Sequence, residues 1–290
     1  MKNNIPAILV TGANGQLGCE IKAASLKYPA YQFVFISKEG LPVDDFDKVT
    51  EYFAANDFDF CINCAAYTAV DKAEAEIEKA FLINADAVAK LSGLCNQHKV
   101  QLIHISTDYV FDGAANQPYR ETDKTNPIAV YGKSKLKGEI LALQNDPGAV
   151  IIRTSWLYSS YKNNFVKTML RLMNEKDSIN VVNDQFGCPT YAADLAEAVM
   201  QIISSAKNNI NPGVYHYSNA GITTWYQFAV AIKNLSGSNC IVNPVSTAEY
   251  PTASKRPVYT ALNTSKIKDQ FNIAIPAWEL SLEKCLKLLS

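Results

Sequence analysis

The sequence predicts an α/β protein built on a doubly wound parallel sheet, with a smaller α/β domain toward the C-terminus. Two observations carry this prediction: nearly continuous apolar runs recur through the first half of the chain, and a helical pattern follows each run. Apolar runs without polar alternation are typical of parallel strands covered by helices on both faces. We expect a first domain over residues 1–155 and a second over residues 156–290, some segments of which return to the first.

Strands and helices alternate regularly in the first domain. We expect strands at residues 7–11, 32–37, 60–65, 101–106 and 149–154. We expect helices at residues 16–26, 46–55, 73–98 and 134–144. Asp45 is a suitable N-cap for the second helix, because its carboxylate can accept a free backbone N–H. The polar Asn84 is a place where the third helix can break.

The second half of the chain is less regular. Helices are expected at residues 192–203, 225–234 and 278–289, with a short strand at residues 215–218. Residues 239–257 are expected to form a loop, because they contain Pro244, Pro251 and Pro257. No flexible linker separates the two halves, so we expect them to share an interface.

Charge balance and the N-terminal residues exclude several classes of protein. The 27 Lys and Arg residues are matched by 28 Asp and Glu, which leaves no basic excess for nucleic-acid binding. The first apolar run is too short for a signal peptide, and no apolar window is long enough to span a membrane. We therefore expect a cytoplasmic protein that binds neither nucleic acid nor membrane.

The seven cysteines favour reduced thiols, because their number is odd and no secretion signal is recognised. Cys61 and Cys64 form a C-x-x-C pattern inside a predicted strand. Strand side chains alternate between faces, so two residues three positions apart point in opposite directions. This geometry suits neither a disulfide nor a shared metal, and we expect buried thiols.

The glycine-rich segment GANGQLG joins the first strand to the first helix. Its three glycines permit a tight turn and a close approach of the backbone to a pyrophosphate, or tight helix–sheet packing alone. The helix N-terminus offers free N–H groups to that anion. We predict that a dinucleotide binds to a Rossmann-type domain at Gly12, Asn14, Gly15, Gln16, Leu17 and Gly18.

The end of the second strand informs the choice of cofactor. An acidic residue there would bind the ribose 2′-hydroxyl of NAD and repel a 2′-phosphate. Ser37 and Lys38 stand at this place instead. We therefore predict that NADPH is preferred, and we leave acceptance of NADH open.

Thr107, Tyr131 and Lys135 form a candidate catalytic set. Thr107 follows a core strand, and Tyr131 and Lys135 are four residues apart, which places them on one face of a helix. A cation beside a phenol can lower its pKa by roughly 1–3 units, which predicts that Lys135 makes Tyr131 a usable general acid or base. The Thr107 hydroxyl can then hydrogen-bond a carbonyl oxygen.

The glycine turn and this trio together resemble the extended short-chain dehydrogenase/reductase family. Longer segments resemble one branch, the dTDP-4-dehydrorhamnose reductases, in the same order along nearly the whole chain. These segments are NCAAYTAVDKAE (63–74), STDYVFDG (106–113), YRETD (119–123), YGKSKLKGE (131–139), RTSWLY (153–158), NNFVKTMLRL (163–172), VVNDQFGCPT (181–190), TTWYQFA (223–229) and YPTASKRP (250–257). Asn84 either matches the helix asparagine of that family or is a polar residue at a kink.

The resemblance implies roles for the matching positions. It places Ala65, Ala66 and Tyr67 at the cofactor, alongside Tyr131 and Lys135. It places the remaining residues at the sugar nucleotide, with Trp156 on the deoxysugar ring and Arg256 near the diphosphate: Thr68, Val70, Asp71, Thr107, Trp156, Gln185, Phe186 and Arg256. The alternatives are a surface charge for Arg256 and an interface hydrophobe for Trp156.

Two positions depart from the family pattern. Pro42 stands where an Asp can contact adenine, which leaves the backbone or Val43 for that contact. Some members have Mg²⁺ at a dimer contact. Glu20 matches one ligand, but Ala193, with Asp194 next to it, stands at another and the C-terminal acid is missing. We leave Mg²⁺ open and assign no metal ligand, since hydride transfer to a ketone needs none. The resemblance also implies a homodimer.

The resemblance implies an oxidoreductase that uses NADPH to reduce the C4 ketone of dTDP-4-dehydro-L-rhamnose. The product, dTDP-L-rhamnose, serves surface polysaccharide synthesis. Alternatives are a reductase of another dTDP-4-keto-6-deoxysugar, an epimerase, and a non-catalytic dinucleotide-binding regulatory subunit. A 4,6-dehydratase is disfavoured, because Tyr109 follows Asp108 where that class has a second acid.

Overall fold

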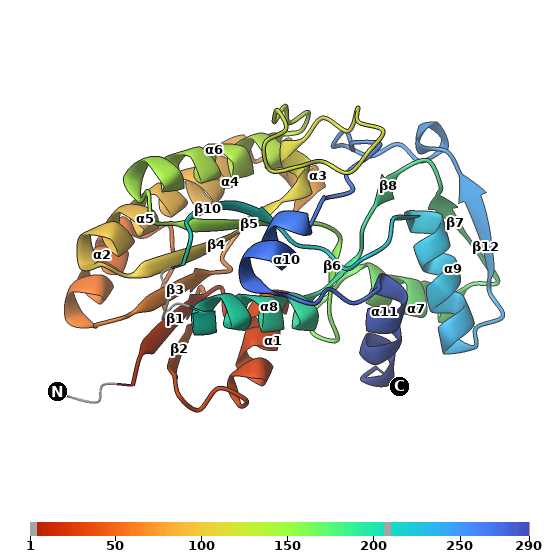
Figure 1. The fold of residues 1–290 in the computed structure, drawn as a ribbon. Coiled ribbons are helices and arrows are strands. Elements are labelled where there is room, and N and C mark those ends of the chain that lie inside the picture. The colour runs from red at the N-terminus through yellow and green to blue at the C-terminus, as the bar shows by residue number, and fades with distance from the viewer. Residues whose placement is uncertain (1–4, 206–209, 290) are drawn as a thin grey trace.

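A parallel six-stranded sheet forms the centre of the computed structural model, which describes residues 5–205 and 210–289. Its strands are β1 (Ala7–Thr11), β2 (Gln32–Ile36), β3 (Phe60–Asn63), β4 (Gln101–Thr107), β5 (Val150–Thr154) and β10 (Gly213–His216). The spatial order β10-β5-β4-β3-β1-β2 confirms the α/β prediction (Figure 1). The chain passes from β1 to β2 on one side of β1, and then crosses back to form β3 on the other side of β1. The carboxyl ends of β1 and β3 therefore lie at a switch point, where such sheets bind ligands.

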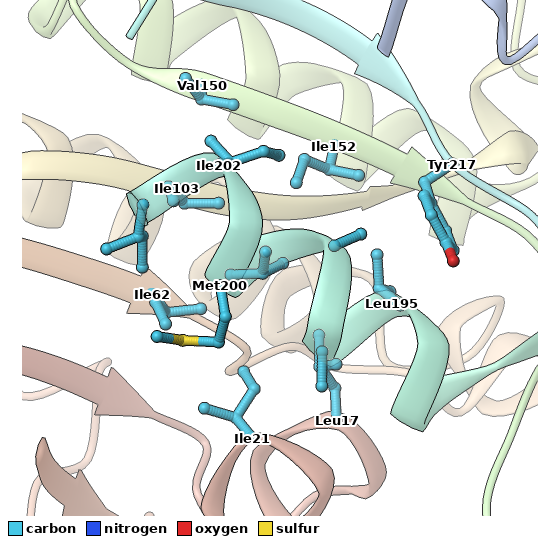
Figure 2. Packing of buried hydrophobic residues seen from close by; sticks show 14 of the residues in the cluster. Leu17, Ile21, Ile62, Ile103, Val150, Ile152, Leu195, Met200, Ile202 and Tyr217 are labelled. Carbon is cyan, nitrogen blue, oxygen red and sulfur yellow. The ribbon is translucent and has the colours of Figure 1, made fainter. Parts of the chain in front are cut away.

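Helices cover both faces of this sheet (Figure 1). Helices α1 (Gln16–Ser25) and α8 (Ala192–Ser204) pack on one face, and α2 (Phe46–Ala55), α5 (Ala87–His98) and α6 (Val130–Asn145) lie on the other. Figure 2 shows Leu17 of α1 and Leu195 of α8 facing the apolar side chains of the sheet. Alternation along β1 supplies both layers, since Ile8 joins this cluster and Leu9 joins the other.

A second apolar core lies in the C-terminal half. Helices α7 (Phe165–Glu175), α9 (Trp225–Ser236) and α11 (Trp278–Lys287) surround the parallel pair β7 (Ser178–Val182) and β12 (Ile241–Val245). Phe228 lies fully buried in this core. Two short pairs lie near it, β6 (Leu157–Tyr158) with β9 (Thr190–Tyr191) and β8 (Phe186–Gly187) with β11 (Thr223–Thr224). Helix α10 (Ser265–Phe271) packs against β10.

The predicted helix at residues 73–98 is divided. The structure has α3 (Val70–Ala73), α4 (Ile77–Phe81), a π-helical turn over Leu82–Asp86 and then α5. The break includes Asn84, as the sequence indicated. Its side chain bonds to the backbone of Tyr67 and to Ser134, so the wider turn positions a buried amide.

The expectation of a loop over residues 239–257 is wrong in part, because β12 includes Pro244. β12 pairs only with β7 in the described chain, and an edge strand tolerates a residue without an N–H on its unpaired side. The expected strand at residues 215–218 is displaced to β10, and α7 was not predicted as a helix.

All seven cysteines are free, and of the C-x-x-C pair Cys61 is buried as expected, whereas Cys64 is only half-buried. Cys61 packs in the cluster that contains Leu9, with Cys95, whereas Cys64 packs against the opposite cluster. In the described parts of the chain, no helix is long and apolar enough to cross a membrane.

Candidate active site

Two adjoining pockets at the carboxyl ends of the central strands share Gly15, Cys64, Ala66 and Thr68. The first, about 440 Å³, is bounded by the glycine turn and the residues after β2 and β3. The second, about 540 Å³, contains the trio and extends to Trp156 and Trp225. Pockets of several hundred cubic ångströms suit small-molecule ligands. Their shared lining makes one elongated cleft that passes the N-terminus of α1.

The glycine turn brings the backbone close to the cleft. Gly12 has φ +65°, and a Cβ there would lie 2.6 Å from the Ala65 nitrogen. A Cβ on Gly18 would lie 2.6 Å from the Gly12 oxygen. Helix α1 begins at Gln16 without a side-chain cap, so its first N–H groups are available to an anion. A dinucleotide diphosphate fits this cradle, which only glycine permits.

The residues after β2 include one that the sequence analysis missed. Lys38 lines the first pocket, and so does Glu39, one position further along. Ser37 does not line it; its side chain bonds to Glu39 and thereby lowers the pKa of that carboxyl. Val43 also lines the pocket, and its contact with an adenine stays a prediction.

Asn84 holds the segment after β3 in place. Its Oδ1 accepts from the Tyr67 N–H at 2.9 Å, and its Nδ2 donates to the Tyr67 oxygen and to Ser134 Oγ, each at 3.0 Å. The amide is fully buried and does not line either pocket. It therefore positions Ala65–Thr68 relative to α6, while Ala65, Ala66, Tyr67 and Thr68 themselves line the first pocket.

Thr107, Tyr131 and Lys135 all line the second pocket. Thr107 ends β4, and its hydroxyl donates to Asp108 Oδ1 at 3.0 Å while accepting the Tyr109 N–H at 3.2 Å. The rings of Tyr109 and Tyr131 meet edge to face, with centroids 5.5 Å apart. Burial raises the pKa of Asp108 to about 6, although the hydrogen bond with Thr107 acts in the opposite direction.

The structure does not support the expected lowering of the Tyr131 pKa by Lys135. Burial raises the pKa of Tyr131 above its ordinary value, and only the hydrogen bond with Thr107 counteracts this. Lys135 turns its Nζ toward the sheet, where it donates to the Ile105 oxygen at 2.7 Å. Burial lowers the pKa of Lys135 to about 8, while Glu139 acts to raise it.

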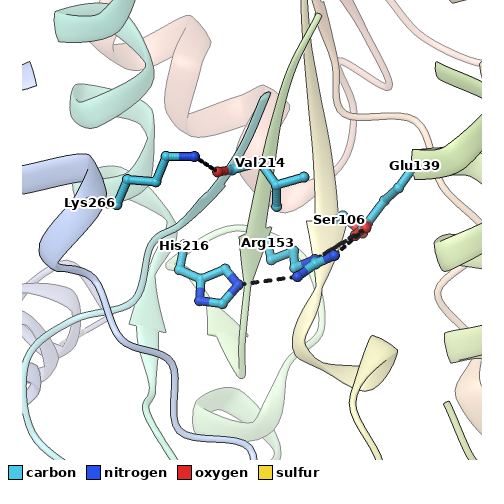
Figure 3. A network of polar contacts seen from close by, with 6 residues as sticks. All are labelled: Ser106, Glu139, Arg153, Val214, His216 and Lys266. Carbon is cyan, nitrogen blue, oxygen red and sulfur yellow. Dashed lines mark hydrogen bonds and ion pairs between the residues drawn. The ribbon is translucent and has the colours of Figure 1, made fainter. Parts of the chain in front are cut away.

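A buried ion pair anchors α6 behind the trio (Figure 3). Arg153 of β5 donates to Glu139 through Nε at 3.0 Å and Nη2 at 2.7 Å, and Ser106 donates to the same carboxylate. His216 Nε2 lies 3.4 Å from Arg153 Nη1. Because Glu139 is one turn after Lys135, this pair fixes the helix that carries two of the three candidate residues.

The predicted sugar-nucleotide residues are not all brought together. Thr68 and Val70 line the second pocket, whereas Asp71 and Arg256 lie beside it. Arg256 pairs with Asp71 at 2.8 Å and donates to the Tyr109 hydroxyl at 3.1 Å. Arg256 is therefore hydrogen-bonded to Tyr109, which lines the second pocket.

Trp156 lies between the pocket and the second core. It has φ +45°, and its ring stacks on Trp225 with centroids 3.6 Å apart. A Cβ on Gly187 would lie 2.5 Å from the Trp156 ring, so only glycine fits there. Trp156 thus lines the pocket and packs against Trp225, and its contact with a deoxysugar ring stays a prediction. Trp225, which also lines the pocket, was not identified as a site residue.

Gln185 and Phe186 line neither pocket. Gln185 is buried and donates to Thr247 Oγ1 at 3.0 Å, and Phe186 is 41% exposed on β8. Their nearness to a nucleotide stays a prediction.

The acidic residues considered for Mg²⁺ have partners within the protein. Ser159 donates to Glu20 at 2.6 Å, and Asn219 Nδ2 donates to Asp194 at 2.8 Å. Among residues 5–205 and 210–289, no three His, Cys, Asp or Glu side chains are grouped as metal ligands. Glu20 and Asp194 are thus already hydrogen-bonded, and we derive no chemistry through a metal.

Comparisons with known proteins agree with this geometry. Residues 6–290 match the family model "RmlD substrate binding domain". A dTDP-4-dehydrorhamnose reductase from Sinorhizobium fredii is 42% identical over 290 residues, covering 96% of this chain and 95% of that protein. The structure of a dTDP-4-dehydrorhamnose reductase from Clostridium acetobutylicum superposes with a TM-score of 0.93 at 40% identity, covering 98% of this chain and 99% of the other. One from Bacillus anthracis, in complex with NADP, gives 0.92 at 37% identity with the same coverage.

Proposed function

Because this chain belongs to the dTDP-4-dehydrorhamnose reductase family, we propose that it reduces the C4 ketone of dTDP-4-dehydro-L-rhamnose with NADPH, forming dTDP-L-rhamnose. One observation carries the proposal: Thr107, Tyr131 and Lys135 line a pocket that is continuous with the glycine-turn pocket. A ketone in the second pocket and a dinucleotide in the first would thus meet at the trio.

The residues divide the chemistry between them. The bound cofactor supplies the hydride. Tyr131 O–H gives its proton to the C4 oxygen as negative charge develops there. The phenol is protonated before the reaction, although burial, which raises its pKa, makes it a weaker acid than an ordinary tyrosine. Thr107 turns its hydroxyl from Asp108 to the same oxygen and stabilises its charge.

Cofactor and sugar nucleotide are held by separate groups. The turn from Gly12 to Gly18 and the N-terminus of α1 hold the diphosphate of the cofactor, and Lys38 favours the 2′-phosphate of NADPH. Glu39 beside Lys38 allows some binding of NADH. Arg256 exchanges its bond to Asp71 for the diphosphate of the sugar nucleotide, since a guanidinium pairs well with phosphate oxygens.

The test is a spectrophotometric assay of NADPH oxidation with dTDP-4-dehydrorhamnose. We expect the wild-type protein to turn over. In Tyr131→Phe we expect kcat to fall on the order of 10²–10⁴-fold. Tyr161→Phe is the control, because Tyr161 is 41% exposed and lies outside both pockets. Absence of turnover in the folded protein, or near-normal kcat in Tyr131→Phe, would contradict the proposal. Bound NAD⁺ and turnover without added reductant would indicate an epimerase instead.

A further inference from the structure

His104 is a buried titratable side chain that the mechanism above does not use. It lies in the middle of β4 with no exposed surface. Its Nδ1 is 3.0 Å from Asn63 Nδ2 on β3, and its Nε2 is 3.3 Å from Lys135 Nζ on α6. Thr11 of β1 completes the row by donating to Asn63 Oδ1 at 2.7 Å. Four side chains thus form a continuous buried row beneath the cleft.

The hydrogen atoms in this row can be assigned from its fixed donors. Asn63 Oδ1 accepts the backbone N–H of Ala65 at 3.2 Å, as well as the Thr11 hydroxyl. The other amide atom, Nδ2, is therefore the one that faces His104, and it can only donate. Nδ1 of His104 must accept. Burial alone already acts to lower the pKa of His104 below its ordinary value, so the ring is neutral and carries its hydrogen on Nε2.

The Nε2 hydrogen then points at Lys135 Nζ. An ammonium group has three donors and no acceptor, so it cannot bond to this hydrogen. An uncharged amine accepts the hydrogen from His104 and still donates to the Ile105 oxygen. We propose that His104 is a positioning residue that donates its Nε2 hydrogen to Lys135 and favours the uncharged amine.

The other groups that face Lys135 act in the opposite direction. Glu139, on the same helix, and Cys64, after β3, both favour the cation. Glu139 is already paired with Arg153 at 2.7 Å, which limits the charge it offers to Lys135. Burial of Lys135 outweighs both and lowers its pKa to about 8. The amine therefore exchanges its proton closer to neutral pH than an ordinary lysine does.

One consequence rests on the proposed function. A dinucleotide carries negative charge into the cleft and favours the ammonium form of Lys135, so NADPH binding above about pH 8 should take up protons. Calorimetric titration in buffers of different ionisation enthalpy would measure this uptake, and its absence would contradict the consequence. The assignment of the hydrogen to Nε2 does not depend on catalysis.

The deciding experiment is NMR of the full chain labelled at histidine and lysine. Above about pH 8, where the Lys135 amine is uncharged, long-range ¹H–¹⁵N spectra should show His104 neutral with its hydrogen on Nε2. The Lys135 signal, assigned with Lys135→Met, should titrate below the other lysines. In His104→Phe we expect that titration to move up by about one pH unit. His98→Phe, a change at an exposed helix position, should leave it unchanged.

A hydrogen on Nδ1, an imidazolium ring, or a Lys135 that titrates with the other lysines would overturn the proposal. An unchanged Lys135 titration in folded His104→Phe would also overturn it. If His104→Phe does not fold, the wild-type spectra alone decide. A chain with the predicted spectra but no reductase activity would contradict the proposed function and leave this inference intact.

Discussion

Replacing Glu139 by Gln removes one charge of the buried pair that anchors α6 and keeps nearly the same shape. Arg153 donates to both carboxylate oxygens, and the two side chains are 5% and 3% exposed. Its guanidinium stays charged, so the variant leaves a buried cation without its counter-ion. Breaking such a pair costs about 3–5 kcal/mol. At about 2.1 cal/mol/K per residue, a chain of 290 residues would lose about 5–8 °C in Tm.

Urea unfolding followed by circular dichroism, together with calorimetry, measures this loss. Glu175→Gln is the matched control, because the Arg171–Glu175 pair is exposed and should contribute less than about 1 kcal/mol. Joint replacement by apolar residues, Glu139→Leu with Arg153→Met, should recover much of the stability. A Glu139→Gln variant within about 1 kcal/mol of the wild type would refute the reasoning.

Three further predictions concern the cleft. Gly187→Ala places a methyl group 2.5 Å from the Trp156 ring, so we expect altered tryptophan fluorescence and a raised KM for the sugar nucleotide; unchanged values would contradict the packing. Thr107→Val should lower kcat about 10²–10³-fold, whereas Thr107→Ser, which keeps the hydroxyl, should retain most of the kcat in the same assay. Equal losses in the two variants would show that the hydroxyl does not stabilise the developing charge. The folded protein holds the Asp108 proton more tightly than the unfolded chain, so stability from this group is present below about pH 4 and lost as pH rises through about 6. The free energy of unfolding of Asp108→Asn, measured in urea, should therefore rise relative to that of the wild type by about 3 kcal/mol between pH 4 and 7. Parallel pH profiles for the two proteins would contradict this.

The central sheet could be predicted because its signals are local. Each strand is an apolar run, and each helix that follows has a regular pattern, as in β1 and α2, whose predicted bounds match the structure. β12 could not be predicted, because Pro244 disfavours a strand unless the pairing partner is known. Strands of two residues, such as β8, depend on contacts with distant segments and leave no periodic pattern.

The candidate site, too, could be predicted only where its sequence signals are local. The glycine turn and the trio carry short motifs, and the cleft brings them together as expected. The direction of Lys135 could not be predicted, because it depends on the Ile105 oxygen and on His104, both on a strand distant in the chain. Trp225 was missed for a similar reason, since its stacking on Trp156 joins residues that are distant in the chain.

The transfer of hydride to C4 of the sugar, which is the central claim, can be measured directly. The chain would react with dTDP-4-dehydrorhamnose and NADPH carrying deuterium at its transferable position, and the product would be examined by NMR. We expect dTDP-L-rhamnose with deuterium at C4, formed in step with NADPH oxidation. An unlabelled product, or deuterium at another carbon, would contradict it.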